Sequence, residues 1–95
     1  IEEAAEAAKS VDVAVVFVGE PSTISGEAAS RSDIRLPGAQ ERLITRIAAT
    51  RTPTVVVIVT GRPLDVTAWI DDVAAAVVVW HGGTEAAAAI IDVLL

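Results

Sequence analysis

The chain of 95 residues contains no cysteine, no methionine and no tyrosine, and only 3% of its residues are aromatic. The absence of cysteine excludes a disulfide framework and a thiolate zinc site, and leaves the redox compartment open. So few aromatic rings argue against a surface that stacks bases. Basic residues are scarce as well: 7 Lys and Arg against 13 Asp and Glu give a formal net charge of −6. This balance argues against nucleic acid and anionic membranes as partners.

Long apolar runs are also absent, because the longest ones have the length of a strand. We therefore expect no transmembrane segment, and no signal peptide is visible. A hydrophobic content of 53% with 21% charged residues excludes a disordered chain, and residues 1–95 are expected to form a single domain. The chain begins at Ile1 and lacks methionine. We expect a processed, tagged or excised piece, and the alanine-rich composition also fits an engineered domain.

Apolar runs alternate with helical patterns along the chain. The predicted elements are a helix over 1–9, a strand over 13–18, a helix that begins at Pro37, a strand over 54–59, a short helix over 65–71 with Trp69 on its buried side, a strand over 75–80 and a helix over about 85–94. Strands that are apolar on both faces favour a parallel sheet between layers of helices. The predicted fold is therefore α/β, a three-layer αβα sandwich that is flavodoxin-like or Rossmann-like, with a short parallel sheet. Its unpaired edges predict a homo-oligomer.

The longest segment without a predicted element runs from Glu20 to Leu36, directly after the first strand. So long a loop is unusual in a compact domain unless it has a function. In parallel α/β folds the functional residues gather at the carboxyl ends of the strands. The candidates that the three strand ends and their loops bring to this rim are Glu20, Glu27, Arg31, Arg62, His81 and Glu85.

Several chemistries are open at this rim. Glu20 and Glu27 could form the pair of carboxylates that glycoside hydrolysis needs, although a solvated loop glutamate is the commoner case. His81 is the only histidine, and the sequence has neither a G-x-S-x-G string nor a cysteine. We therefore interpret His81 as a turn residue in preference to a member of a catalytic triad or a metal site. Residues 82–84 could bind an anion, but no nucleotide motif surrounds them. For Arg62 we prefer a structural ion pair with a helix to direct binding of a ligand. We expect no metal.

Four strings, read in order, resemble the carboxy-terminal α/β sandwich domain of family 3 glycoside hydrolases, the β-glucosidase and β-xylosidase group. They are VDVAVVFVGE (11–20), SGEAASRSDIRLPGAQERLI (25–44), PTVVVIVTGRPLDV (53–66) and AAAVVVWHGGTEAAAAIIDVLL (74–95). The second is the most specific, with a Gly-Glu, an Arg after three further residues, and a Leu-Pro-Gly-x-Gln helix start. The resemblance covers nearly the whole chain.

The resemblance implies an active site between a (β/α)8-type barrel, which supplies an aspartate nucleophile, and this domain, which supplies the acid/base glutamate. By motif position that glutamate is Glu27. The implied activity is retaining hydrolysis of β-glucosides without metal or organic cofactor. The substrate would bind only together with the barrel, and the isolated chain would be inactive. The tail departs from the family at Ala86–Ala89, where Gly-Gly-x-Ala is usual. The alternative is a designed or minimal α/β folding module without catalytic function that self-associates through its sheet edges.

Overall fold

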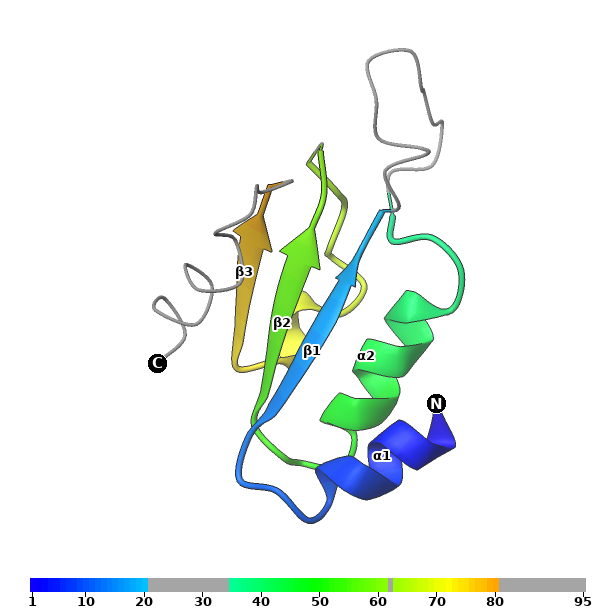
Figure 1. Ribbon diagram of the computed structural model, residues 1–95, viewed down its shortest axis with the longest axis vertical. Coiled ribbons are helices and arrows are strands. Elements are labelled where there is room, and N and C mark those ends of the chain that lie inside the picture. The colour runs from blue at the N-terminus through cyan, green and yellow to red at the C-terminus, as the bar shows by residue number, and fades with distance from the viewer. Residues whose placement is uncertain (21–34, 62, 81–95) are drawn as a thin grey trace, which may run out of the picture.

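The computed structural model describes residues 1–20, 35–61 and 63–80. Their elements are, in chain order, helix α1 (Glu2–Ala8), strand β1 (Ala14–Gly19), helix α2 (Gln40–Ala48), strand β2 (Thr54–Val59), the 3-10 helix η2 (Ile70–Asp72) and strand β3 (Ala75–Val79). The strands are parallel in the order β1-β2-β3, and α1 lies beside α2 (Figure 1). The predicted α/β sandwich with a short parallel sheet is confirmed. The predicted helix over 85–94 lies outside the described residues.

The core lies between α2 and one face of the sheet. In the parallel register Val16 pairs with Val56 and Val18 with Ile58, which places these four side chains on the same face. All four are buried in one cluster, whose other members are Ala8, Leu36, Ile44, Ile47 and Trp69. Trp69 is 1% exposed, as its predicted position on the buried side requires. This cluster holds the sheet and the two helices in a fixed arrangement.

Four of the predicted elements have bounds within one residue of those observed, namely α1, β1, β2 and β3. The prediction that Pro37 begins a helix is wrong by three residues, since α2 starts at Gln40. Gly38 has a φ of 65°, in the left-handed region, so no right-handed helix can pass through it. The Leu-Pro-Gly sequence is therefore a turn that delivers Gln40 to the first position of the helix.

The predicted helix over 65–71 is also wrong, because the only helical residues in that range are Ile70 and Asp71, the first two of η2. Asp65, the first residue of the predicted helix, belongs to a turn. The Oδ1 of Asp65 accepts hydrogen bonds from the backbone N–H of Thr67 (3.0 Å) and from the Thr67 hydroxyl (2.7 Å). An aspartate that bonds to the second residue after it stabilises a turn, and this local bond competes with a helix.

The opposite face of β1 is open to solvent. Val15 and Phe17 are two positions apart on this face and are 46% and 57% exposed. Within the described ranges, β1 has a single neighbouring strand, so its outer edge is unpaired along most of its length. Exposed apolar surface and an open edge are both features that association covers. The predicted homo-oligomer stays a prediction.

No helix in residues 1–20, 35–61 or 63–80 is long and apolar enough to cross a bilayer.

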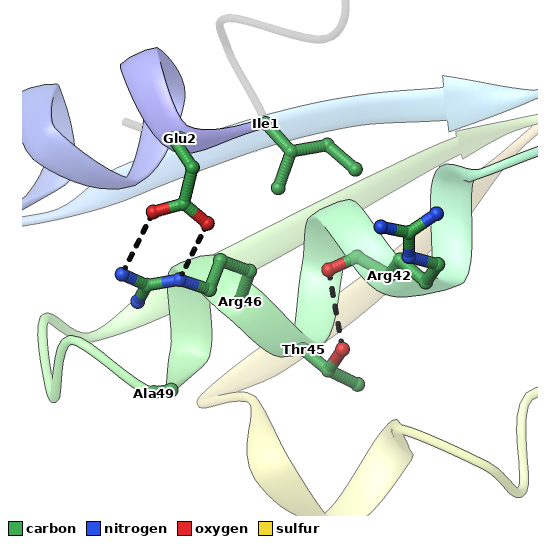
Figure 2. A pocket seen from close by; sticks show the side chains of 6 residues that line it. All are labelled: Ile1, Glu2, Arg42, Thr45, Arg46 and Ala49. Atoms are coloured by element: carbon green, nitrogen blue, oxygen red, sulfur yellow. Dashed lines mark hydrogen bonds and ion pairs between the residues drawn. The ribbon is translucent and has the colours of Figure 1, made fainter.

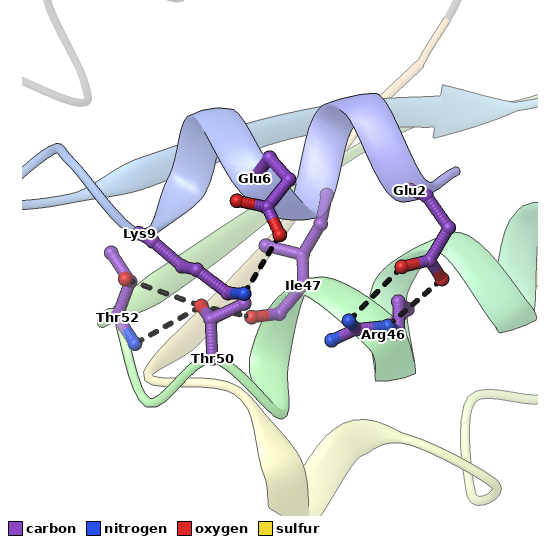
Figure 3. Close-up of polar contacts among 7 residues, drawn as sticks. All are labelled: Glu2, Glu6, Lys9, Arg46, Ile47, Thr50 and Thr52. Atoms are coloured by element: carbon purple, nitrogen blue, oxygen red, sulfur yellow. Dashed lines mark hydrogen bonds and ion pairs between the residues drawn. The ribbon is translucent and has the colours of Figure 1, made fainter.

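An ion pair joins the two α-helices on the surface. The Arg46 guanidinium donates from Nε to Glu2 Oε1 (3.0 Å) and from Nη2 to Glu2 Oε2 (3.1 Å), as Figure 3 shows. The hydrogen bond and the charge of Arg46 lower the pKa of Glu2 from its usual value of 4.5. A second ion pair joins Glu6 in the last turn of α1 to Lys9, the residue after the helix, at 2.8 Å.

Replacement of Glu2 by glutamine should destabilise the chain slightly, and only at a pH where the pair is charged. Because the folded pKa of Glu2 is lowered, the stabilisation is present above 4.5 and is lost as the pH falls through the folded value. Urea melts should therefore separate the native chain from Glu2→Gln at neutral pH and not at a pH well below 4.5. Glu3→Gln is the control, since Glu3 lies on the same exposed turn. A difference that is the same at both pH values would contradict this account.

Candidate functional site

The carboxyl ends of the three parallel strands lie at the same end of the sheet (Figure 1). In this fold class that end is where a ligand site forms. The described residues there include a group of four, Gly19, Glu20, Gln40 and Thr60, which we call the strand-end cluster. Hydrogen bonds connect its members across the ends of β1 and β2 and the start of α2.

The side chain of Gln40 binds both backbone polar groups of Gly19, the last residue of β1. Its side-chain Oε1 accepts a hydrogen bond from the N–H of Gly19 at 2.7 Å, and its Nε2 donates to the C=O of Gly19 at 2.9 Å. The next residue, Glu20, donates its N–H to Val59 O of β2 at 3.1 Å. Since successive residues of a strand direct these groups to opposite sides, Gly19 faces the outer edge of β1. The amide of Gln40 therefore takes the place that a further strand would occupy there.

Gly19 allows β1 and β2 to approach closely at this point. Its φ is 155°, and a Cβ added to it would lie 1.9 Å from the carbonyl oxygen of Val59. A side chain of any size would collide with the β2 backbone, which has no freedom to move away without loss of the sheet pairing. The sequence can place a strand end in this position only with glycine.

Glu20, the residue directly after β1, is buried although glutamate is usually found on the surface. It is 4% exposed, and its Oε1 accepts a hydrogen bond from the hydroxyl of Thr60 at 3.0 Å. Thr60 is 1% exposed and donates its N–H to Val79 O at 3.2 Å. Buried polar groups are costly unless they are hydrogen-bonded, so these contacts connect the ends of all three strands.

Of the predicted rim residues, the structure describes only Glu20, and it lies at the rim. The others, Glu27, Arg31, Arg62, His81 and Glu85, lie outside the described residues. Their roles stay predictions. Gln40 and Thr60 were not among the predicted site residues. The signals that could have found them are the Gln at the end of the Leu-Pro-Gly-x-Gln motif and the Thr that follows an uninterrupted apolar strand.

A separate hollow lies between the two helices and is lined by Ile1, Glu2, Arg42, Thr45, Arg46 and Ala49 (Figure 2). Its volume is about 320 Å³, and it contains no residue of the strand-end cluster. The guanidinium of Arg46 is already bound by Glu2 there. Among the residues that the structure describes, no group of three or more His, Cys, Asp or Glu side chains could hold a metal ion.

A family profile described as the glycosyl hydrolase family 3 C-terminal domain matches residues 1–95. The chain belongs to this family. It is 44% identical over 94 residues to a periplasmic β-glucosidase of Salmonella typhimurium. This match covers 99% of the chain and 12% of the relative. The chain is 35% identical over 92 residues to a β-xylosidase of Formosa agariphila, over 97% of the chain and 13% of the relative.

Solved structures of family members have the same fold. The β-glucosidase of Kluyveromyces marxianus in complex with glucose matches 98% of the chain with a TM-score of 0.90 at 33% identity, and the match covers 11% of that protein. A β-glucosidase of Listeria innocua in complex with gluconolactone matches 95% of the chain with a TM-score of 0.88 at 36% identity, over 12% of its length. The chain thus spans about an eighth of its relatives' length. These matches do not favour the alternative of a designed folding module.

Proposed function

We propose that the chain supplies the acid/base glutamate, Glu27, to the active site of a retaining β-glucosidase whose nucleophile belongs to another part of the polypeptide. The observation that supports this most is the match of 94 of its 95 residues to a periplasmic β-glucosidase at 44% identity. The string that holds Glu27 is the most family-specific part of the sequence. The proposed chemistry uses two carboxylates and needs neither a metal nor an organic cofactor.

The second carboxylate is proposed to come from outside these 95 residues. Retention requires two carboxyl groups about 5 to 5.5 Å apart, one on each side of the scissile bond. Glu20 is the described carboxylate at the rim, but its side chain is buried against Thr60. A nucleophile must reach the anomeric carbon of a bound sugar, which a 4% exposed side chain cannot do. A β-glucoside would therefore be bound and hydrolysed only with the remaining domain.

The proposed sugar is argued separately from the proposed reaction, since one of the matched relatives is named a β-xylosidase. A glucoside and a xyloside differ by one hydroxymethyl group, and a pocket discriminates such a difference by only about 1–3 kcal/mol. We place β-glucosides first because the relatives in solved complexes are β-glucosidases crystallised with glucose and gluconolactone.

A chimera tests this proposal. Residues 1–95 replace the matching segment of the Salmonella typhimurium periplasmic β-glucosidase, and hydrolysis of phenyl β-glucoside and phenyl β-xyloside is measured. We expect turnover from the chimera, with the glucoside preferred, and none from the 95-residue chain alone, because that chain has only one member of the carboxylate pair. The host protein without the segment is the control. A chimera that folds, as a cooperative melt would demonstrate, but has no turnover on either substrate would contradict the proposal.

A further inference from the structure

We propose that Gln40 and Thr60 are positioning residues for the acid/base glutamate, which they orient by fixing the base of the segment that carries it. This inference rests on the proposed function of Glu27. Neither side chain is proposed to touch the substrate. Both act on the backbone or side chain of residues 19 and 20, where the chain leaves β1 toward Glu27, seven positions after Glu20.

Gln40 connects the two ends of this segment. It is the first residue of α2, and it binds Gly19, which is 21 positions earlier in the chain. Two hydrogen bonds to one peptide residue fix an orientation as well as a distance. Leu36 lies just before the Leu-Pro-Gly turn and is 5% exposed within the core cluster. The return of the chain toward Gln40 is therefore anchored as well, and the segment begins and ends on fixed backbone.

Hydrogen bonds hold the end of β1 on both of its edges. On the outer edge Gln40 binds Gly19, and on the inner edge Glu20 donates to Val59 O at 3.1 Å. The Thr60 hydroxyl then fixes the Glu20 side chain at 3.0 Å in a site where both residues are almost fully buried. Gln40→Ala would remove two hydrogen bonds to the Gly19 backbone, and Thr60→Val would remove one to the Glu20 side chain, so in each variant fewer bonds fix the strand end.

A small displacement of the strand end matters for proton transfer. A general acid must lie within hydrogen-bond reach of the leaving oxygen, about 2.6–3.2 Å. A misplacement of about 1 Å that originates far from the reacting atoms can reduce a rate about 100-fold. The strand-end cluster is the nearest described structure to the predicted acid along the chain, so its hydrogen bonds are the ones that would carry such an effect.

The test compares two substrates in the chimera described above. Phenyl β-glucoside has a poor leaving group that needs a proton, whereas dinitrophenolate leaves without one. For Gln40→Ala and Thr60→Val we expect kcat/KM to fall about 10- to 100-fold with phenyl β-glucoside and less than about threefold with 2,4-dinitrophenyl β-glucoside. The ratio of the two values in one preparation does not depend on the folded fraction, so a purely structural role would leave it unchanged.

Matched controls come from the same helix. Arg42→Ala and Thr45→Val change exposed residues of α2, where the Thr45 hydroxyl donates to the Arg42 carbonyl within the helix, and both should leave the ratio as it is. Thr60→Val keeps the shape of the side chain, so the test can be made with this variant alone if Gln40→Ala does not fold.

The outcomes separate this inference from the proposed function. If Glu27→Gln changes the ratio but neither Gln40→Ala nor Thr60→Val does, the positioning role is wrong and the proposed function stands. If Glu27→Gln itself leaves the ratio unchanged, the proposed function is wrong, and the inference is wrong with it. A changed ratio in all three variants, with unchanged controls, supports both.

Discussion

Replacement of Gly19 by alanine should lower the free energy of unfolding of the chain by about 3 kcal/mol or more. Two causes act together at this residue. Its φ of 155° lies where residues with a side chain are strained, and the new Cβ would lie 1.9 Å from the carbonyl oxygen of Val59. That oxygen accepts the N–H of Glu20, so the strands cannot separate there without loss of this bond. Urea melts of the purified chain measure the change.

Gly38→Ala is the matched control for this prediction. Gly38 also has a positive φ, at 65°, but a Cβ added to it would have no atom within 4 Å. Alanine at this position should therefore cost only the conformational term, about 1–2 kcal/mol. Equal losses in Gly19→Ala and Gly38→Ala would show that the backbone angle alone matters, and would contradict the close approach of β1 and β2 as the dominant cause.

Most of the fold could be predicted from local pattern. Uninterrupted apolar runs determine β1, β2 and β3, since only a buried parallel sheet accommodates them, and the observed bounds differ from the predicted ones by at most one residue. The start of α2 could not be placed, because Pro37 suits a first helical turn equally well, and the left-handed φ of Gly38 that decides the matter depends on how the turn enters the core.

The candidate site could be located from the sequence but not described in detail. The rule that strand ends form a rim predicted the position of Glu20, yet nothing in the sequence around it predicts that it is 4% exposed. Its hydrogen-bond partner Thr60 is 40 positions away along the chain, and the contact of Gly19 with Gln40 spans 21 positions. Such pairs are brought together by the tertiary fold, which a pattern of neighbouring residues does not contain.

Replacement of Glu27 by glutamine should nearly abolish activity in the chimera with the Salmonella typhimurium host. In the first step of retaining hydrolysis the acid protonates the leaving oxygen as the bond to the anomeric carbon breaks and the nucleophile bonds to that carbon. In the second step the same group, now a base, takes a proton from the attacking water. Glutamine can do neither, so kcat/KM with phenyl β-glucoside should fall by a factor of about 10² to 10⁴. Glu3→Gln, an exposed glutamate of α1, should change nothing.

The most direct test of the central claim is the response of Glu27→Gln to the leaving group and to azide. Dinitrophenolate needs no proton to leave, so the first step should proceed almost normally with 2,4-dinitrophenyl β-glucoside. Azide needs no base, so it should attack the anomeric carbon of the glycosyl-enzyme, release the enzyme carboxylate and yield β-glucosyl azide. The account predicts that azide raises turnover of this variant and produces that compound. An equal loss of activity with both glucosides, with no β-glucosyl azide formed, would contradict it.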